Sequence, residues 1–259
     1  MEFLTGFAVF LFGLAVGSFA NVVILRYGTG ERIVNSRSHC FHCGCQLEWP
    51  DLMPVLSFFV LKGKCRHCHS KISIQYPLVE LVFGALFLLT FLKWSRDFGS
   101  YEHLPVLFLW LFSIFLLVIL SAYDFRHKIL PDLFSFLFIF SGLALSVFFF
   151  WNGVENFVLA LAPAFLIFFL WLFSRGRAMG FGDAKLMLGG GLFLGWPSAL
   201  FALVFSFWAG AFYGITLLLI DRRISLKSEI PFGPFLVLGI LIVFFFAKSF
   251  EQFFQILNF

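Results

Sequence analysis

Residues 104–124 read LPVLFLWLFSIFLLVILSAYD, and no charged residue interrupts this stretch before Asp124. An α-helix needs about 20 apolar residues to cross the hydrocarbon core of a bilayer. The stretch therefore predicts a transmembrane helix over 104–122, with an acidic residue just beyond its end. A charge at membrane depth is costly, so an acid beside the hydrocarbon is a hypothesis of function by default.

The composition extends this prediction to the whole chain. The 259 residues are 61% hydrophobic and 12% charged, with a mean hydropathy of +0.98. A soluble domain carries about 25% charged residues, so lipid must cover much of this surface. Barrel strands alternate polar and apolar residues, whereas the apolar runs here are long and uniform. The candidate spans are 3–25, 77–93, 104–122, 133–151, 155–173, 184–196, 198–220 and 232–248.

The predicted fold is an all-α polytopic membrane protein with about eight transmembrane helices. The one long polar segment forms a loop between the first and second helices. Three regions are expected: a first transmembrane helix (1–25), a cysteine-rich loop (26–76) and a polytopic domain (77–259). No basic region precedes the first span, so we expect a retained helix and no signal peptide. The expected partner surface is a lipid bilayer, and no nucleic acid is expected.

The distribution of basic residues predicts the topology. If the N-terminus faces outward, 15 of the 18 Lys and Arg residues fall on the cytoplasmic side. Cytoplasmic loops carry the excess of Lys and Arg in membrane proteins. Both termini are therefore expected outside, and the loop 26–76 inside. Asp124 and Asp183 are then both expected at the cytoplasmic edge of the membrane.

All five cysteines of the chain lie in the loop 26–76. Cys40 and Cys43 form one C-x2-C pair, and Cys65 and Cys68 form another. Two such pairs can present four thiolates to one Zn²⁺ in a tetrahedral arrangement. Four protein ligands leave no open position for water, so the predicted site is structural. Its metal would supply folding energy to a loop that has little apolar content of its own.

Other interpretations of the cysteines stay open. They could be free thiols or a redox CxxC pair, although disulfides are not expected in a reducing compartment. Cys45 is left over, as a spare thiol or an alternative ligand. Lys64 and Arg66 flank the second pair, where positive charge favours thiolates. Four nearby histidines are kept as backup ligands: His39, His42, His67 and His69.

A second acid lies in the sequence Gly180-Phe181-Gly182-Asp183-Ala184-Lys185, 59 residues after Asp124. Glycine allows close backbone approach, which a substrate strand needs in order to reach a carboxylate. Two paired carboxylates can hydrolyse a peptide bond, one as the base for water and the other as the acid. Asp124 and Asp183 are the predicted catalytic pair, supported by Gly180, Gly182 and Lys185. Which aspartate is the base is left open.

Each acid also has a simpler interpretation. Asp124 could be an interfacial acid paired with Arg126 or Lys128. Asp183 could belong to a tight turn that enters a helix. Asp132 follows Pro131 and suits the N-terminus of a helix, where an acid is favoured.

Five motifs in order give the chain a resemblance to the type 4 prepilin peptidases, over nearly its whole length. The motifs are Gly17-Ser18-Phe19-Ala20-Asn21-Val22; the cysteine region from Ser38 to Glu80; Asp124 to Asp132, with Leu130 where Ile is commoner; Gly180 to Lys185; and Pro231-Phe232-Gly233-Pro234-Phe235.

The resemblance implies an aspartic endopeptidase of the bacterial inner membrane. Members of that family cut the basic leader from type IV prepilins or pseudopilins at the cytoplasmic face. Members with the cysteine loop usually also methylate the new N-terminal amine with S-adenosylmethionine. The family's catalytic pair corresponds to Asp124 and Asp183.

The sequence does not place the binding site of S-adenosylmethionine, because no nucleotide-binding glycine motif is present. Asn21 could contribute to it or could merely cap a helix. Four acids could meet the basic leader, of which Glu80 is the best placed, beside an apolar span: Glu31, Glu48, Asp51 and Glu80.

Two other functions stay open. One is a leader peptidase that does not methylate. The other is a membrane zinc-ribbon scaffold or a transporter in which the acids carry ions. Transporters usually place polar residues or broken helices at mid-membrane, whereas the acids here lie at one edge.

Overall fold

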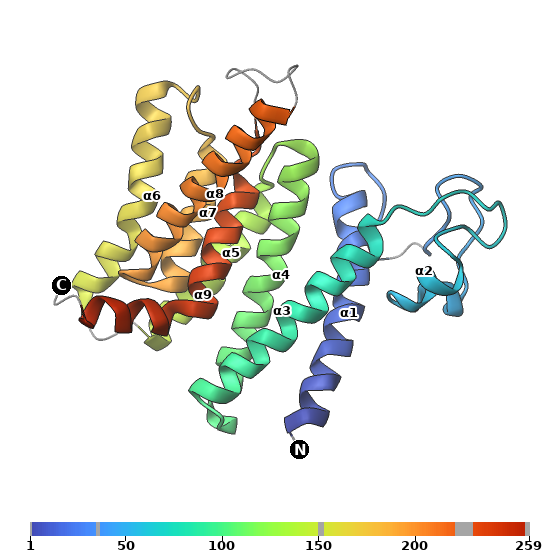
Figure 1. The fold of residues 1–259 in the computed structure, drawn as a ribbon, viewed down its shortest axis with the longest axis horizontal. Helices are drawn as coiled ribbons and strands as arrows, with labels where there is room; N and C mark the ends of the chain where they lie inside the picture. Colours follow the sequence, from blue (N-terminus) through green and yellow to red (C-terminus); the bar gives the residue numbers. More distant parts are fainter. Residues whose placement is uncertain (1, 35–36, 150–152, 221–229, 257–259) are drawn as a thin grey trace. The chain divides into compact units, whose positions relative to one another are not determined.

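The chain folds into long helices joined by short loops, with one larger insertion. The structure is a computed structural model that describes residues 2–34, 37–149, 153–220 and 230–256. The long helices are α1 (Glu2–Arg26), α3 (Gln75–Asp97), α4 (Leu104–His127), α5 (Asp132–Phe149), α6 (Val154–Ser174), α7 (Phe181–Leu194), α8 (Ser198–Ile220) and α9 (Gly233–Ile256). These ranges contain a helix for each of the eight predicted spans, and the all-α fold is confirmed (Figure 1).

Five of these helices are long and apolar enough to cross a membrane over their described residues. They are Phe3–Arg26, Gln75–Asp97, Tyr101–His127, Val154–Ser174 and Ser198–Ile220. The apolar stretches Asp132–Phe148 and Gly233–Phe246 are shorter. Helix α7 has 14 residues, or about 21 Å at 1.5 Å per residue. It begins three residues earlier than the predicted span 184–196, so that Asp183 lies inside its first turn.

The cysteine loop holds only short elements. They are a 3-10 helix at Trp49–Leu52 and the helix α2 (Leu56–Val60); a second 3-10 helix, Tyr101–His103, precedes α4. Within the described residues, β-structure is limited to two isolated bridges, His39 with Gln46 and Lys64 with Lys71. Each bridge closes one C-x2-C turn, which is the arrangement of a zinc-ribbon-like loop.

The chain forms two compact units, Met1–Leu107 and Phe108–Phe259. In the first unit α1 packs along α3. Glycine permits this close packing, because a Cβ added to Gly17 would lie 2.7 Å from the Cα of Glu80. Small residues at helix contacts bring backbones together in membrane proteins, where lipid gives no hydrophobic drive for association. The contact fixes Glu80 beside the end of α1.

In the second unit α7 packs against α5, α6, α8 and α9. Its buried residues include a run of three glycines, Gly189, Gly190 and Gly191. A Cβ added to Gly191 would lie 2.2 Å from the carbonyl oxygen of Ala160 in α6. The glycine run therefore lets α7 lie directly against its neighbours and carries Asp183 into the unit.

Helix α4 is held beside α5 and α9 by two side-chain contacts. The hydroxyls of Ser113 and Ser141 are 2.9 Å apart, joining α4 to α5. The rings of Trp110 and Phe244 meet edge to face at 5.0 Å, joining α4 to α9. Aromatic pairs favour this geometry. These contacts orient the end of α4, where Asp124 lies.

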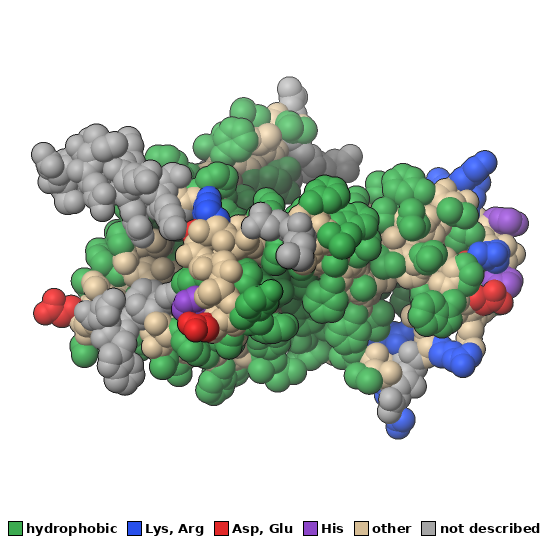
Figure 2. Space-filling view, turned by 90° about the horizontal axis from the view of Figure 1, so that it is seen from below, with side chains coloured by type: hydrophobic (Ala, Val, Ile, Leu, Met, Phe, Trp, Pro, Cys, Tyr) green, Lys and Arg blue, Asp and Glu red, His purple; other side chains and the backbone are tan. Residues whose placement is uncertain are grey.

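Hydrophobic side chains cover most of the described surface on the face shown in Figure 2, and Lys, Arg and His side chains gather over the cysteine loop, at the right of that view. Many large apolar side chains of the long helices are exposed, as expected where lipid is the solvent.

The basic residues at 222, 223 and 227, which entered the topology count, lie outside the described residues, as do both chain ends. The side of the membrane on which the termini lie stays a prediction.

The glycine contact between α6 and α7 can be tested by adding one methyl group. We expect Gly191→Ala to destabilise the fold by about 1–3 kcal/mol, because a backbone carbonyl cannot move aside as a side chain can. The measurement is thermal unfolding of the purified protein in detergent. Gly214→Ala in α8 is the matched control, since its nearest neighbour, Ile230 Cδ1, would lie at an ordinary 3.7 Å. Equal stability of the two variants would contradict the close packing.

Candidate functional site

The first aspartate of the predicted pair lies near the end of α4. Asp124 is 5% exposed, and its Oδ2 accepts a hydrogen bond of 3.0 Å from the backbone N–H of Gly233, at the start of α9. A Cβ at Gly233 would lie 2.6 Å from that oxygen. Only glycine leaves room for the carboxylate here. The alternative ion pair of Asp124 with Arg126 or Lys128 is not formed among the described residues.

The second aspartate lies in the first turn of α7. Asp183 is 8% exposed, and its Oδ2 accepts the backbone N–H of Gly180 at 3.1 Å. Gly180 is the N-cap of α7 in an extended conformation. The positive end of a helix dipole favours a carboxylate at this position. Asp183 is thus part of a helix start, as the simpler interpretation held, and this does not conflict with a role in a pair.

Gly182 joins the second aspartate motif to the first. A Cβ at Gly182 would lie 3.1 Å from the Cβ of Leu130, which precedes the start of α5. The absence of a side chain lets the start of α7 approach the segment between α4 and α5. The two motifs that carry Asp124 and Asp183 therefore meet in space.

The two carboxylates lie close enough for the charge of Asp124 to act on Asp183. Each uses Oδ2 for one backbone N–H, and the Oδ1 of each makes no hydrogen bond with a described residue. Two near carboxylates share protons as one system. General acid–base chemistry on a water molecule needs two neighbouring acids with available oxygens, and each Oδ1 here lacks a hydrogen bond from a described residue.

Lys185 does not face the pair. Its ammonium forms an ion pair with the carboxylate of Asp132 and lies 5.0 Å from the centre of the Phe181 ring. Asp132 is the first residue of α5, so its predicted place at a helix start is confirmed. Lys185 therefore ties α7 to α5 and supports the site through the position of its helix.

The four cysteines of the two C-x2-C pairs form one cluster. The sulfurs of Cys40, Cys43, Cys65 and Cys68 all lie within 4.8 Å of one another, and those of Cys40 and Cys68 are 3.9 Å apart. Four sulfurs at about 2.3 Å from a tetrahedral Zn²⁺ would be about 3.8 Å apart. The donor set thus fits a metal ion. Cys45 and the four nearby histidines are not part of the cluster.

The ionisation of the clustered thiols favours the binding of a cation. Backbone N–H groups of Cys43 and His42 lower the pKa of the Cys40 thiol to about 6. The N–H of Cys45 favours the Cys43 thiolate, yet burial and the thiols of Cys68, Cys45 and Cys40 raise the pKa of Cys43 to about 12. Four thiols this close cannot all ionise alone, and a divalent cation removes that conflict because it binds thiolates.

Arg66 does not act on the thiols as its position in the sequence suggested. Its Nε and Nη2 donate to Asp51 Oδ1 at 3.0 and 2.7 Å, and Asp51 is buried. The pair braces the 3-10 helix Trp49–Leu52 against the second cysteine turn. Asp51 is thereby already partnered, which weakens its candidacy as a binder of a basic leader.

Two family models match the chain. A model described as the bacterial peptidase A24 N-terminal domain matches residues 11–94. A model described as the type IV leader peptidase family matches residues 110–215. Both aspartates fall in the second match and all the cysteines in the first.

Several curated relatives match most of the chain. A protein from Myxococcus xanthus is 38% identical over 231 residues, covering 86% of this chain and 67% of the relative. One from Aeromonas hydrophila is 31% identical (89% and 87%), and one from Legionella pneumophila is 32% identical (92% and 90%). All three are named prepilin leader peptidase/N-methyltransferase. No solved structure matches.

This chain belongs to the type IV leader peptidase family. The resemblance drawn from the motifs is confirmed. Sequence reasoning had no physical role for Gly233, which lies 109 residues from Asp124 in the chain. Gly233 lies in the motif Pro231-Phe232-Gly233-Pro234-Phe235, but the motif does not identify the residue that it contacts.

The cysteine cluster predicts a tightly bound metal ion. We expect about one metal ion per chain in the purified protein, measured and identified by inductively coupled plasma mass spectrometry. Cys65→Ser should lose most of it, because a serine hydroxyl does not ionise to replace a thiolate ligand. Cys45→Ser is the matched control and should keep the metal. Equal metal content in the two variants would contradict the assignment of the four ligands.

Proposed function

We propose that this chain removes the leader from type IV prepilins or pseudopilins and methylates the new N-terminal amine. The observation that carries the proposal is the meeting of two buried carboxylates, Asp124 and Asp183, in a chain of the type IV leader peptidase family. The names of the relatives support both activities. The free Oδ1 atoms of the pair support the first.

In the proposed cleavage, one carboxylate is ionised and takes a proton from water as the water oxygen bonds to the scissile carbonyl carbon. The other is protonated and donates a hydrogen bond to the carbonyl oxygen. The carbon–nitrogen bond then breaks, and the leaving amine takes a proton from the pair. The products are a carboxylate on the leader and a free amine on the pilin. Gly233 and Gly180 hold the two acids in place through their backbone N–H groups.

The second proposed step uses that amine. S-adenosylmethionine would supply a methyl group: the amine nitrogen bonds to the methyl carbon, the sulfur–carbon bond breaks with its electron pair left on sulfur, and the nitrogen loses a proton. In this division 26–76 is the metal-binding loop associated with methylation. The peptidase domain spans residues 77–259, and residues 1–25 form the first transmembrane helix.

We assign the metal of the cysteine cluster as structural zinc. Support comes from the donor set of four sulfurs and from the spacing of Cys40 and Cys68. The cluster also favours the bifunctional enzyme over a peptidase that does not methylate, since it builds a folded loop beside α1 and α3. The proposed location is the bacterial inner membrane, with the loop and both aspartates on the cytoplasmic side, supported by the distribution of Lys and Arg.

The peptidase mechanism predicts that each aspartate is needed. In membranes that contain a co-expressed prepilin, Asp183→Asn and Asp124→Asn should each lower cleavage by about 100-fold or more, because an amide neither takes nor gives the proton. Cleavage is read from the shift in pilin size at equal enzyme abundance. Glu155→Gln, an exposed acid at the start of α6, is the matched control and should cleave normally. Full cleavage by either aspartate variant would overturn the mechanism.

Gly233 should matter for the same reaction through its contact with Asp124. We expect Gly233→Ala to lower the cleavage rate about tenfold or more, because the added Cβ would collide with Oδ2 and displace a charge-assisted hydrogen bond. Gly214→Ala again serves as the control. If Gly233→Ala cleaves at the wild-type rate while folded normally, the glycine does not position the carboxylate.

A further inference from the structure

A cavity of about 480 Å³ lies within the first unit, between the end of α1, the start of α3 and the cysteine loop. Its wall is mostly apolar, with a few polar groups from each element. Sites for small ligands have this character and span roughly 300–1,000 Å³. The wall residues used below are Asn21 and Arg26 of α1, Tyr76 and Glu80 of α3, and Phe58 of the loop.

The first supporting observation is a buried acceptor on Asn21 in the wall of the cavity. Asn21 is 1% exposed, and its Nδ2 donates to the carbonyl oxygen of Tyr76 at 3.1 Å. That acceptor fixes the orientation of the amide. Its Oδ1 is the only fully buried side-chain nitrogen or oxygen, among the residues with described side chains, that has no hydrogen-bond partner. A buried acceptor without a donor costs about 1–3 kcal/mol.

The second supporting observation is the buried carboxylate of Glu80. Glu80 is 7% exposed, and its carboxylate accepts the backbone N–H of Val55 at 2.7 Å and a hydrogen bond from the side chain of Ser18. Within the described part of the chain no Lys, Arg or His forms an ion pair with it. A buried carboxylate is unfavourable unless a cation or several donors compensate it. The wall of the cavity therefore holds one buried carboxylate without an ion pair among the described residues, although basic residues such as Lys71 also line it.

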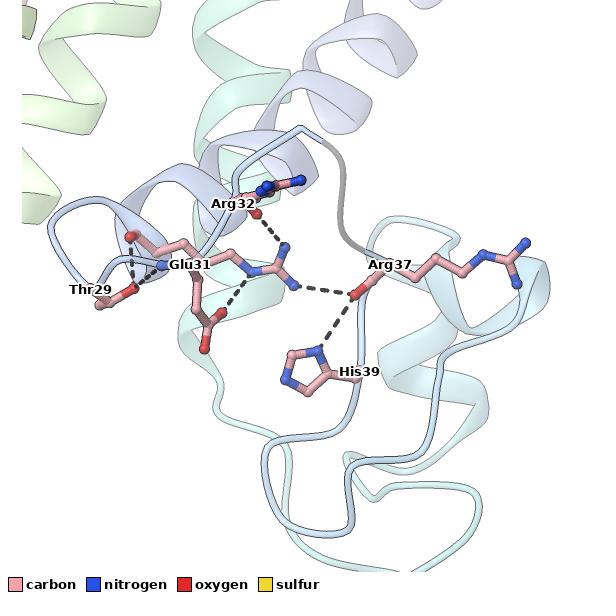
Figure 3. Close-up of polar contacts among 6 residues, drawn as sticks. Thr29, Glu31, Arg32, Arg37 and His39 are labelled. Carbon is pink, nitrogen blue, oxygen red and sulfur yellow. Dashed lines mark hydrogen bonds and ion pairs between the residues drawn. The ribbon is translucent and has the colours of Figure 1, made fainter.

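The guanidinium of Arg26, which also lines the cavity, pairs with a different acid. It is 5% exposed and pairs with Glu31 at 3.3 Å. It also donates to the carbonyl oxygens of Arg32 and Arg37 at 3.2 and 3.4 Å. Figure 3 shows the loop folding back around this group, with His39 also directed at the Arg37 carbonyl. The end of α1 thus fixes one side of the cavity.

We propose that this cavity is the binding site of S-adenosylmethionine, with Glu80 and Asn21 recognising its positively charged methionine part. The inference rests on the proposed function and deepens it. The sulfonium and ammonium groups supply the positive charge that would pair with Glu80 and the donor that the Asn21 Oδ1 lacks. The aromatic rings of Phe58 and Tyr76 in the wall suit the flat adenine.

A basic leader peptide is the other cation that could meet Glu80. The volume of the cavity favours the small molecule, since about 480 Å³ is typical of sites for small ligands. The peptide is therefore kept as an outcome of the test. If a basic peptide occupies the cavity, removing the charge of Glu80 should weaken prepilin cleavage and leave the binding of S-adenosylmethionine unchanged.

The test is equilibrium binding of radiolabelled S-adenosylmethionine to the purified full chain in detergent. Glu80→Gln keeps the shape and the acceptor for Val55 but removes the charge. We expect its Kd for S-adenosylmethionine to rise at least tenfold. Glu102→Gln, an exposed acid outside the cavity in the same unit, is the matched control and should bind within twofold of the wild type.

The contrary outcomes separate the inference from the proposed function. Unchanged binding in Glu80→Gln, with the wild type binding and methylating, overturns the site alone. A higher KM for prepilin with unchanged binding assigns the cavity to the leader and overturns the inference. A wild type that cleaves but neither binds nor methylates overturns the inference together with the methylation half of the function.

A second measurement does not depend on the folding of a variant. Ultraviolet irradiation of the wild-type chain with S-adenosylmethionine, followed by peptide mapping, should place the label in the wall segments near 18–26 or 38–80. Label confined to residues 108–259 would overturn the site. Competition by excess S-adenosylhomocysteine shows that the label reports specific binding.

Discussion

Backbone N–H groups hold both carboxylates of the proposed pair, and the rest of the second unit is arranged around that constraint. An acid at the edge of a membrane needs a donor that does not itself carry a competing charge. Gly233 and Gly180 provide such donors from the starts of two helices. A lysine or arginine in their place would fix the pair in its ionised form, whereas an amide leaves protons free to move. Proton transfer requires that freedom.

The same constraint explains why glycine recurs in this unit. Gly233 must lack a side chain because Asp124 fills that space, and a Cβ at Gly182 would make a tight contact of 3.1 Å with Leu130. Gly191 lets α7 reach the backbone of α6. The approaches at Gly182 and Gly191 bring the segment before α5 and the helix α6 against the short helix α7, and the approach at Gly233 joins α9 to α4. The placement of Asp183 is thus a consequence of packing along the whole length of α7, not of its first turn alone.

The sequence was sufficient for the features that depend on local pattern. Apolar runs located all eight long helices, and cysteine spacing identified the four members of the cluster, leaving out Cys45. Contacts between segments that lie far apart in the chain could not be predicted from the sequence. Arg66 beside Cys65 suggested an effect on the thiol, but its guanidinium turns to Asp51. Lys185 beside Asp183 suggested a role at the pair, but it reaches Asp132. A neighbour in sequence fixes where a side chain starts and not which of several partners it meets.

The two proposed reactions take place at two sites that require different electrostatic properties. Cleavage needs two acids whose protons can move, and these are held by neutral donors with their Oδ1 atoms free of hydrogen bonds to described residues. Methylation needs a site that attracts a cation and then releases a product without the sulfonium charge. The buried Glu80 has no ion-pair partner of its own among the described side chains. The loss of positive charge on methyl transfer removes part of what holds the donor there. A carboxylate that has no ion pair with a described residue therefore favours the reactant over the spent product, which is the direction that turnover requires.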